Sequence, residues 1–168
     1  MSNIFIVPIF GIPASGKSSF ISAFVQSINT TNIQTRVISF DTIFHDIIKD
    51  PNIFDPNEWH KAKYLFKEQI CNAIETIQND FKLNDNKSFV ILLEDVLHLR
   101  SMRKNIYQIA KHYSIHYCSI FLSCDVELAI IRDSKRIGKA HVGKDTITKL
   151  YNNFEYPDKD INFEHQTS

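Results

Sequence analysis

Short apolar runs alternate with longer amphipathic stretches along this chain. Four runs are almost wholly apolar and of strand length, as strands buried in parallel sheets are. They cover residues 4–10, 36–40, 88–93 and 116–122. Pro8 falls inside the first run and conflicts with a strand there, because proline cannot donate to a sheet ladder. We nevertheless predict a strand over residues 4–10.

Between and after these runs, apolar residues recur at intervals of three and four, which is typical of helices with one buried face. The predicted helices cover residues 18–28, 58–81, 101–113, 125–136 and 144–154, and a further helix begins near Thr42. Prolines and polar residues indicate loops at 51–56 and 82–87, and we expect the polar segment beyond Tyr156 to be loosely held. Strands that alternate with helices predict an α/β fold, in which helices cover both faces of a parallel sheet.

The composition is that of an ordinary globular protein, with 43% hydrophobic and 23% charged residues among 168. This length suits one domain with a core of its own. No apolar stretch approaches the roughly 18 residues that span a bilayer, and the N-terminus lacks the basic segment of a secretory signal. With three scattered cysteines interpreted as reduced thiols, these features favour a cytoplasmic protein without a membrane partner.

The formal net charge is +0, so contact with a nucleic acid would need a local basic patch. Basic residues gather between positions 100 and 111 and again between 135 and 144. Because surface lysines and arginines are usually only solvated, charge alone is a weak argument for RNA binding.

The clearest chemical signal follows the first predicted strand, where residues 11–18 read GIPASGKS and match G-x-x-x-x-G-K-[ST]. Glycines in such a loop let backbone N–H groups turn toward phosphate oxygens, and the next helix directs its positive end at them. The lysine reaches the β- and γ-phosphates and the serine hydroxyl binds Mg²⁺. We therefore predict that the loop binds ATP through these residues: Gly11, Ala14, Ser15, Gly16, Lys17, Ser18 and Ser19.

Carboxylates follow two further predicted strands. Glu94 and Asp95 end the third strand, where an acidic residue can hold Mg²⁺ directly or through water, and we expect Asp95 to matter more. Asp41 follows the second strand and could accept the proton of an attacking hydroxyl, or cap the helix that begins near Thr42. Since parallel sheets bind ligands at the carboxyl ends of their strands, these residues and the phosphate loop should meet at one edge.

Arg132 and Arg136 are four residues apart in a predicted helix and would share one of its faces. Two guanidinium groups there could clamp a transferring phosphoryl group. Because Lys135 and Lys139 lie nearby, a merely solvated helix face is an equal alternative on spacing alone.

Several stretches together match one known pattern. Residues 11–20 are similar to G-x-P-x-S-G-K-S-T-F, and Asp41 and Trp59 follow at matching places. The most specific likeness lies in residues 94–122, which contain the triplet Ser-Met-Arg and the segment YQIAKHY. An R-x-x-x-R lid motif and a Phe-Glu-Tyr-Pro segment come after it. In these features the chain resembles the O-phosphoseryl-tRNA(Sec) kinases, also called L-seryl-tRNA(Sec) kinases.

The resemblance implies a three-layer P-loop fold with a helical lid, and it implies a reaction. ATP would phosphorylate the hydroxyl of a serine esterified to the selenocysteine tRNA, in selenocysteine biosynthesis. Asp41 would activate that hydroxyl, and Arg132 and Arg136 would stabilise the transition state. Ser101 and Arg103 of the triplet would contact the substrate. The whole chain would correspond to the kinase domain, without that family's C-terminal tRNA-binding domain.

Two other functions stay open. A regulatory tRNA-binding ATPase of the elongator-associated kind shares the phosphate loop, although it typically carries a Gly-Phe-Arg-like triplet in place of residues 101–103. A P-loop kinase that acts on the hydroxyl of a small metabolite is the second.

Overall fold

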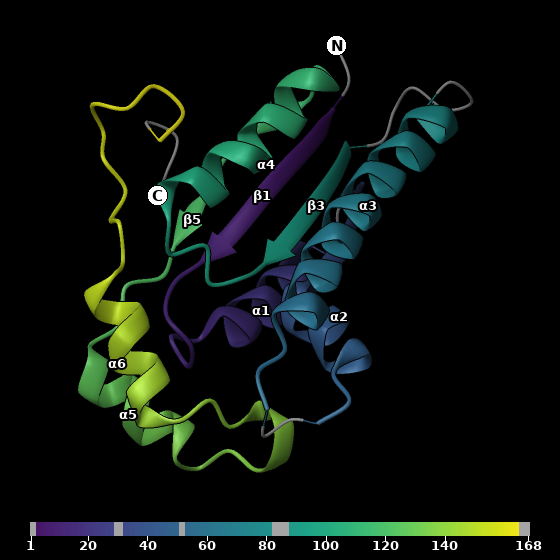
Figure 1. The fold of residues 1–168 in the computed structure, drawn as a ribbon. Helices are drawn as coiled ribbons and strands as arrows, with labels where there is room; N and C mark the ends of the chain where they lie inside the picture. The colour runs from purple at the N-terminus through teal and green to yellow at the C-terminus, as the bar shows by residue number, and fades with distance from the viewer. Residues whose placement is uncertain (1–2, 29–31, 51–52, 82–87, 165–168) are drawn as a thin grey trace.

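The computed structural model describes residues 3–28, 32–50, 53–81 and 88–164 and contains a five-stranded parallel sheet (Figure 1). The strand order is β2-β3-β1-β4, and β5 also pairs with β1. The strands are β1 (Ile4–Phe10), β2 (Ile33–Ser39), β3 (Ser88–Glu94), β4 (His116–Tyr117) and β5 (Ile120–Phe121). This is the predicted parallel α/β architecture.

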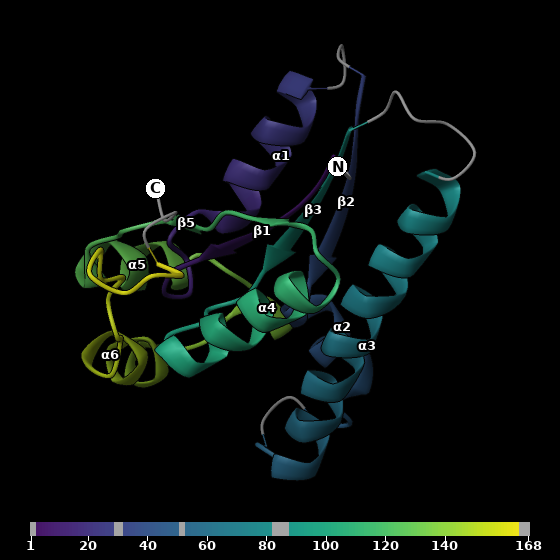
Figure 2. The same cartoon turned by 90° about the horizontal axis from the view of Figure 1, so that it is seen from above.

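Helices cover both faces of the sheet: α1 lies on one face, and α3 and α4 lie on the other (Figure 2). A second group of helices, formed by α5, η1 and α6, lies beyond the carboxyl ends of the strands (Figure 1). The helices are α1 (Lys17–Ile28), α2 (Phe40–Ile47), α3 (Pro56–Phe81), α4 (Arg100–His112), α5 (Val126–Asp133), the 3₁₀-helix η1 (Gly138–Ala140) and α6 (Lys144–Asn152). No helix of the described residues is long and apolar enough to cross a membrane.

Side chains of β1 alternate between two apolar cores, as the period of a strand requires. Ile4, Ile6 and Phe10 belong to the large core under α3 and α4. Val7 and Ile9 point to the opposite face and pack with Ile21 of α1. Because both faces are covered, nearly every position of β1 is apolar, and this is why the run was recognisable.

Pro8 lies in β1 opposite the gap between the short strands β4 and β5. The N–H groups of Cys118 and Leu122 donate to Ile6 O and Phe10 O, so even-numbered residues of β1 face the β4–β5 side. Pro8 lies between these two contacts and has no N–H to offer there. The predicted strand 116–122 is accordingly divided into β4 and β5.

Other boundaries also differ from the prediction. β2 begins at Ile33 instead of residue 36, because an edge strand tolerates alternating polar residues that conceal its start. Phe40 opens α2 instead of ending the strand, with Ser39 as the N-cap residue. Asp41 is therefore in the first turn of α2 and is not its cap. Pro56 starts α3, as the first turn of a helix permits. The predicted loop 82–87 lies outside the described residues.

The segment after α6 is held firmly as far as Glu164, contrary to the loose tail that its polarity suggested. The Phe163 ring stacks on Tyr107 of α4 with 5.5 Å between ring centroids. Glu164 is 3% exposed and pairs with Arg103 of the same helix. One aromatic contact and one buried ion pair thus fasten this segment to α4.

Candidate functional site

The loop between β1 and α1 has the backbone geometry of a phosphate cradle. Gly11 has φ 152°, and a Cβ on it would lie 2.4 Å from Leu122 O, so only glycine fits. Gly16 has φ 102°, a conformation that other residues rarely adopt. Ala14 also has a positive φ of 61°, and strained backbone of this kind is common at ligand-binding sites.

The side chains of Lys17 and Ser15 give this cradle donors that can bind an anion. The Lys17 ammonium is buried and donates to Gly11 O and Ile12 O, each at 3.0 Å. Burial lowers the pKa of Lys17, while the carboxylates of Asp41 and Glu94 oppose that change. The Ser15 hydroxyl oxygen is buried and has no hydrogen-bond partner among the described residues. A donor left unpaired in this position suits a phosphate oxygen.

Ser18 and Glu94 are brought together from the two sides of the site. Ser18 lies in the first turn of α1, and its hydroxyl donates to Glu94 Oε1 at the end of β3, at 2.5 Å. Ser19 is exposed on the same turn. In the described residues there is no group of three or more His, Cys, Asp or Glu side chains that could hold a metal ion. Mg²⁺ does not need one, because it is commonly held by one or two carboxylates together with substrate phosphates.

Asp95, the neighbour of Glu94, has a different environment. It is 5% exposed, and its Oδ2 accepts a hydrogen bond from Lys63 Nζ of α3 at 2.8 Å. The same ammonium lies 4.2 Å from the centroid of the Phe40 ring and 5.2 Å from that of Trp59. The two adjacent acidic residues are thus divided between two partners: Glu94 contacts the serine of the cradle, and Asp95 contacts Lys63.

Lys63 is a residue that the sequence did not single out. It lies four residues after Trp59 on the same helix, but no local pattern signals that it pairs with a carboxylate 32 positions further along the chain. Only the packing of α3 across the end of β3 creates the contact.

Asp41 lies in the first turn of α2, and its charge acts on the Lys17 ammonium of the cradle. Desolvation by the surrounding protein raises the pKa of Asp41, and the negative charges of Asp95 and Glu94 raise it further. Lys17 acts in the opposite direction. A carboxylate with a raised pKa beside a phosphate cradle has the electrostatic character of a general base.

The two arginines do not share a helix face, because α5 ends at Asp133. The Asp133 carboxylate is 1% exposed and accepts hydrogen bonds from Val142 N and Gly143 N, which turns the chain back after the helix. Arg132 still reaches the cradle and donates to Ala14 O at 3.5 Å. Arg136 lies beyond the helix, where its Nη1 is 3.7 Å from Asp133 Oδ1.

Arg103 is placed in the interior and not on a substrate-facing surface. Its side chain is 1% exposed and donates to Glu164 Oε1 at 2.7 Å, to Leu97 O at 2.9 Å and to Glu155 O at 2.8 Å. These contacts occupy Nε and both terminal nitrogens, so this position does not support the predicted contact with substrate. Ser101 is exposed on the first turn of α4.

A parallel sheet of this order, with a glycine-lysine-serine cradle after β1 and an acidic residue ending β3, defines the class of P-loop nucleoside triphosphate-binding proteins. Within this class the chain belongs to the KTI12 family. The family model, described as chromatin associated protein KTI12, matches residues 5–165.

Curated relatives named L-seryl-tRNA(Sec) kinase support the resemblance seen in the sequence. The protein from Methanococcus maripaludis is 24% identical over 88% of this chain and 51% of its own length. The protein from Mus musculus is 29% identical over 94% of this chain and 56% of its own length. The chain thus spans about half the length of these relatives.

Solved structures share the fold. Kti12 from Chaetomium thermophilum, in complex with ADP-AlF3, has a TM-score of 0.64 at 16% identity, over 96% of this chain and 86% of that one. A kinase from Mycobacterium tuberculosis, the APS kinase CysC with AMPPNP and APS, has a TM-score of 0.53 at 16% identity, over 80% and 71%. At these identities the likeness establishes the P-loop kinase fold and nothing finer.

Proposed function

We propose that this chain is an ATP-dependent phosphotransferase that phosphorylates the serine hydroxyl of seryl-tRNA(Sec). The observation that carries the proposal is the position of Asp41, a carboxylate of raised pKa beside the Lys17 ammonium and the cradle. A carboxylate in this position can take the proton of an attacking hydroxyl, which transfer to an alcohol requires. The curated relatives that cover most of this chain are named for this reaction.

Each residue of the site has a role in this reaction. The backbone of the loop and the Ser15 hydroxyl bind the phosphates, and Lys17 exchanges its two loop carbonyls for phosphate oxygens. Asp41 accepts the proton of the attacking hydroxyl. Arg132, which already touches the cradle, and Arg136 stabilise the charge that develops on the transferring phosphoryl group.

The residues present also fit a magnesium ion. Ser18 and Glu94 set two oxygen donors side by side next to the cradle, and Mg²⁺ prefers oxygen ligands. When bound, Mg²⁺ neutralises charge on the phosphate oxygens. We assign this role to Glu94 in preference to Asp95, since Asp95 is already paired with Lys63.

A second candidate is a tRNA-binding ATPase, favoured by the match to the KTI12 model and by the fold of Kti12. Incubation of the protein with γ-labelled ATP and seryl-tRNA(Sec), followed by release of the amino acid, separates the two. Labelled phosphoserine from the wild type, with at least a hundredfold less from Asp41→Asn, supports the kinase. Phosphate release that tRNA stimulates without labelled phosphoserine rejects the kinase and supports the ATPase.

A further inference from the structure

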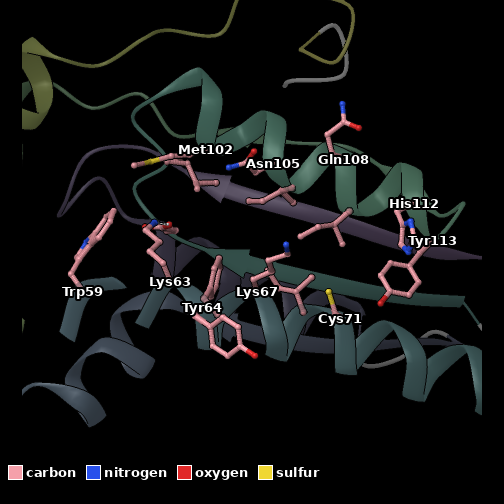
Figure 3. A pocket seen from close by; sticks show the side chains of 16 residues that line it. Trp59, Lys63, Tyr64, Lys67, Cys71, Met102, Asn105, Gln108, His112 and Tyr113 are labelled. Atoms are coloured by element: carbon pink, nitrogen blue, oxygen red, sulfur yellow. Dashed lines mark hydrogen bonds and ion pairs between the residues drawn. The ribbon is translucent and has the colours of Figure 1, made fainter. Parts of the chain in front are cut away.

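A long groove between α3 and α4 begins at the carboxyl end of β3, beside the phosphotransfer site. It has a volume of about 840 Å³ and is lined by 16 residues (Figure 3). Lys63, Lys67 and Cys71 extend from α3 toward α4, where Met102 lies opposite (Figure 3). Tyr64 of α3 also lines the groove. Core residues of both helices form its floor. No residue role proposed above uses this space.

Polar contacts between α3 and the opposite wall lie at both ends of the groove. At the end near the site, Lys63 of α3 pairs with Asp95 at 2.8 Å. At the far end, the Tyr113 hydroxyl donates to Glu75 Oε1 at 2.6 Å. Between these two links the groove separates α3 from α4.

The lining combines exposed aromatic surface with a positive charge. Tyr64 lines the groove and is 66% exposed. Trp59 stands half-buried at the end nearest the site. Asp95 is the single acidic residue among the 16 that line the groove, and Lys63 neutralises it. Lys67 therefore gives the groove a positive charge that no carboxylate of its lining balances.

We propose that this groove binds the single-stranded 3′ end of an RNA, with bases stacked on Tyr64 and Trp59 and a backbone phosphate at Lys67. Aromatic faces beside lysines are the combination that binds unpaired nucleotides, since every base has a face to stack and every linkage has a charge. An apolar peptide would use the floor but would leave Lys67 without a partner. The groove extends the site proposed above and depends on a tRNA being its acceptor.

The dimensions agree with this occupant. The α4 wall runs from Met102 to Tyr113, which is about 16 Å at the helical rise of 1.5 Å per residue. A stacked strand advances about 3.4 Å per nucleotide, so the groove has the length of about five nucleotides. A seryl group alone would occupy only its first part. The reacting end of the RNA would thus lie near Trp59, with the preceding nucleotides along α3.

Trp59 provides the test, because it is the only tryptophan of the chain. The full chain is titrated without ATP with the trinucleotide CCA, the sequence of a tRNA 3′ end, while tryptophan fluorescence is recorded. We expect a saturable change. Tyr64→Ala should raise the dissociation constant about fivefold or more, as loss of one base–aromatic stack does. Lys67→Ala should weaken binding and lower the slope of log affinity against log salt by about 0.7.

Lys61→Ala is the matched control, since Lys61 is an exposed lysine of α3 outside the groove. Fluorescence that does not respond to CCA overturns the proposal, as does equal weakening by Lys61→Ala and Lys67→Ala. An amphipathic peptide that alters the fluorescence where CCA does not also overturns it. Tyr64 and Lys67 are both exposed, so circular dichroism of their variants should match the wild type.

The kinase assay keeps the two proposals apart. The groove proposal expects Tyr64→Ala to raise KM for seryl-tRNA(Sec) and to leave kcat unchanged. Phosphoserine formed with an unchanged KM would reject the groove and retain the kinase. Binding of CCA that depends on Tyr64 and Lys67, without any phosphoserine product, would retain the groove and reject the serine acceptor.

Discussion

Replacing Arg103 with methionine should destabilise the fold while leaving the phosphate loop intact. Methionine keeps much of the apolar volume but removes three hydrogen bonds of 2.7–2.9 Å and the charge opposite Glu164. Both partners are almost fully buried, at 1% and 2% exposure. Removing one partner of a buried ion pair costs about 3–5 kcal/mol, because the other charge remains in the interior.

The lower end of this range applies here. In this variant the Glu164 carboxylate still accepts a hydrogen bond from Asp158 N at 2.9 Å and contacts Arg100 Nε at 3.4 Å, so it keeps two polar partners. We therefore expect a loss of about 3 kcal/mol, a large part of the 5–15 kcal/mol that typically stabilises a domain. With a urea m-value of about 2 kcal/mol/M, the unfolding midpoint should fall by about 1.5 M.

Urea unfolding followed by circular dichroism measures this shift, and a second variant tests its cause. Arg103→Met combined with Glu164→Gln removes both charges and should regain part of the loss, since no buried charge then lacks its partner. An Arg103→Met protein that unfolds at the wild-type midpoint but no longer binds tRNA would refute a structural role. Arg103 would then act on the substrate, as the sequence motif suggested.

Four further predictions concern the cradle and its base. Lys17→Ala should abolish nucleotide binding in isothermal titration calorimetry while unfolding stays cooperative; retained ATP affinity would contradict its phosphate role. Gly11→Ala should lower the melting temperature, because its Cβ would lie 2.4 Å from Leu122 O; an unchanged melting temperature would show that the loop can shift. The raised pKa of Asp41 predicts that kcat/KM falls, as pH decreases, at a higher pH than an ordinary carboxylate would give. Because its pKa is raised in the folded protein, ionised Asp41 destabilises the fold at every pH above the pKa that it has in the unfolded chain. Asp41→Asn should therefore stabilise the protein at pH 7, and this gain should disappear below about pH 4.

Local patterns predicted the parts of this protein that depend on local physics. β1 was recognisable because both of its faces are buried, and the cradle because its glycines and lysine are adjacent in sequence. What the sequence could not supply was long-range pairing. Lys63 meets Asp95 across 32 positions, and Arg103 meets Glu164 across 61, with no local signal at either end. The prediction for Arg103 was drawn from a motif, and a motif does not state whether an arginine is buried.

The end of α5 illustrates a second limit. Helical spacing continues past Asp133 in the sequence, and it placed Arg132 and Arg136 on one face. The helix stops because Asp133 bonds to backbone N–H groups that return from nine and ten positions later. Helical periodicity compares only residues a few positions apart. It therefore cannot detect that a side chain ends a helix by bonding to a loop further along the chain.

The strand order also has a consequence for how the chain is made. β3 lies between β2 and β1, and Ile4 pairs with Phe89, 85 positions later. During synthesis at about 5–20 residues per second, β1 therefore waits on the order of 4–17 seconds before its first strand partner exists. Because β2 also pairs with β3, the emergence of one seven-residue segment from the ribosome joins the first three strands at once. Until then the most apolar strand of the protein has no partner in the sheet, and the nascent chain is most vulnerable to aggregation in that interval.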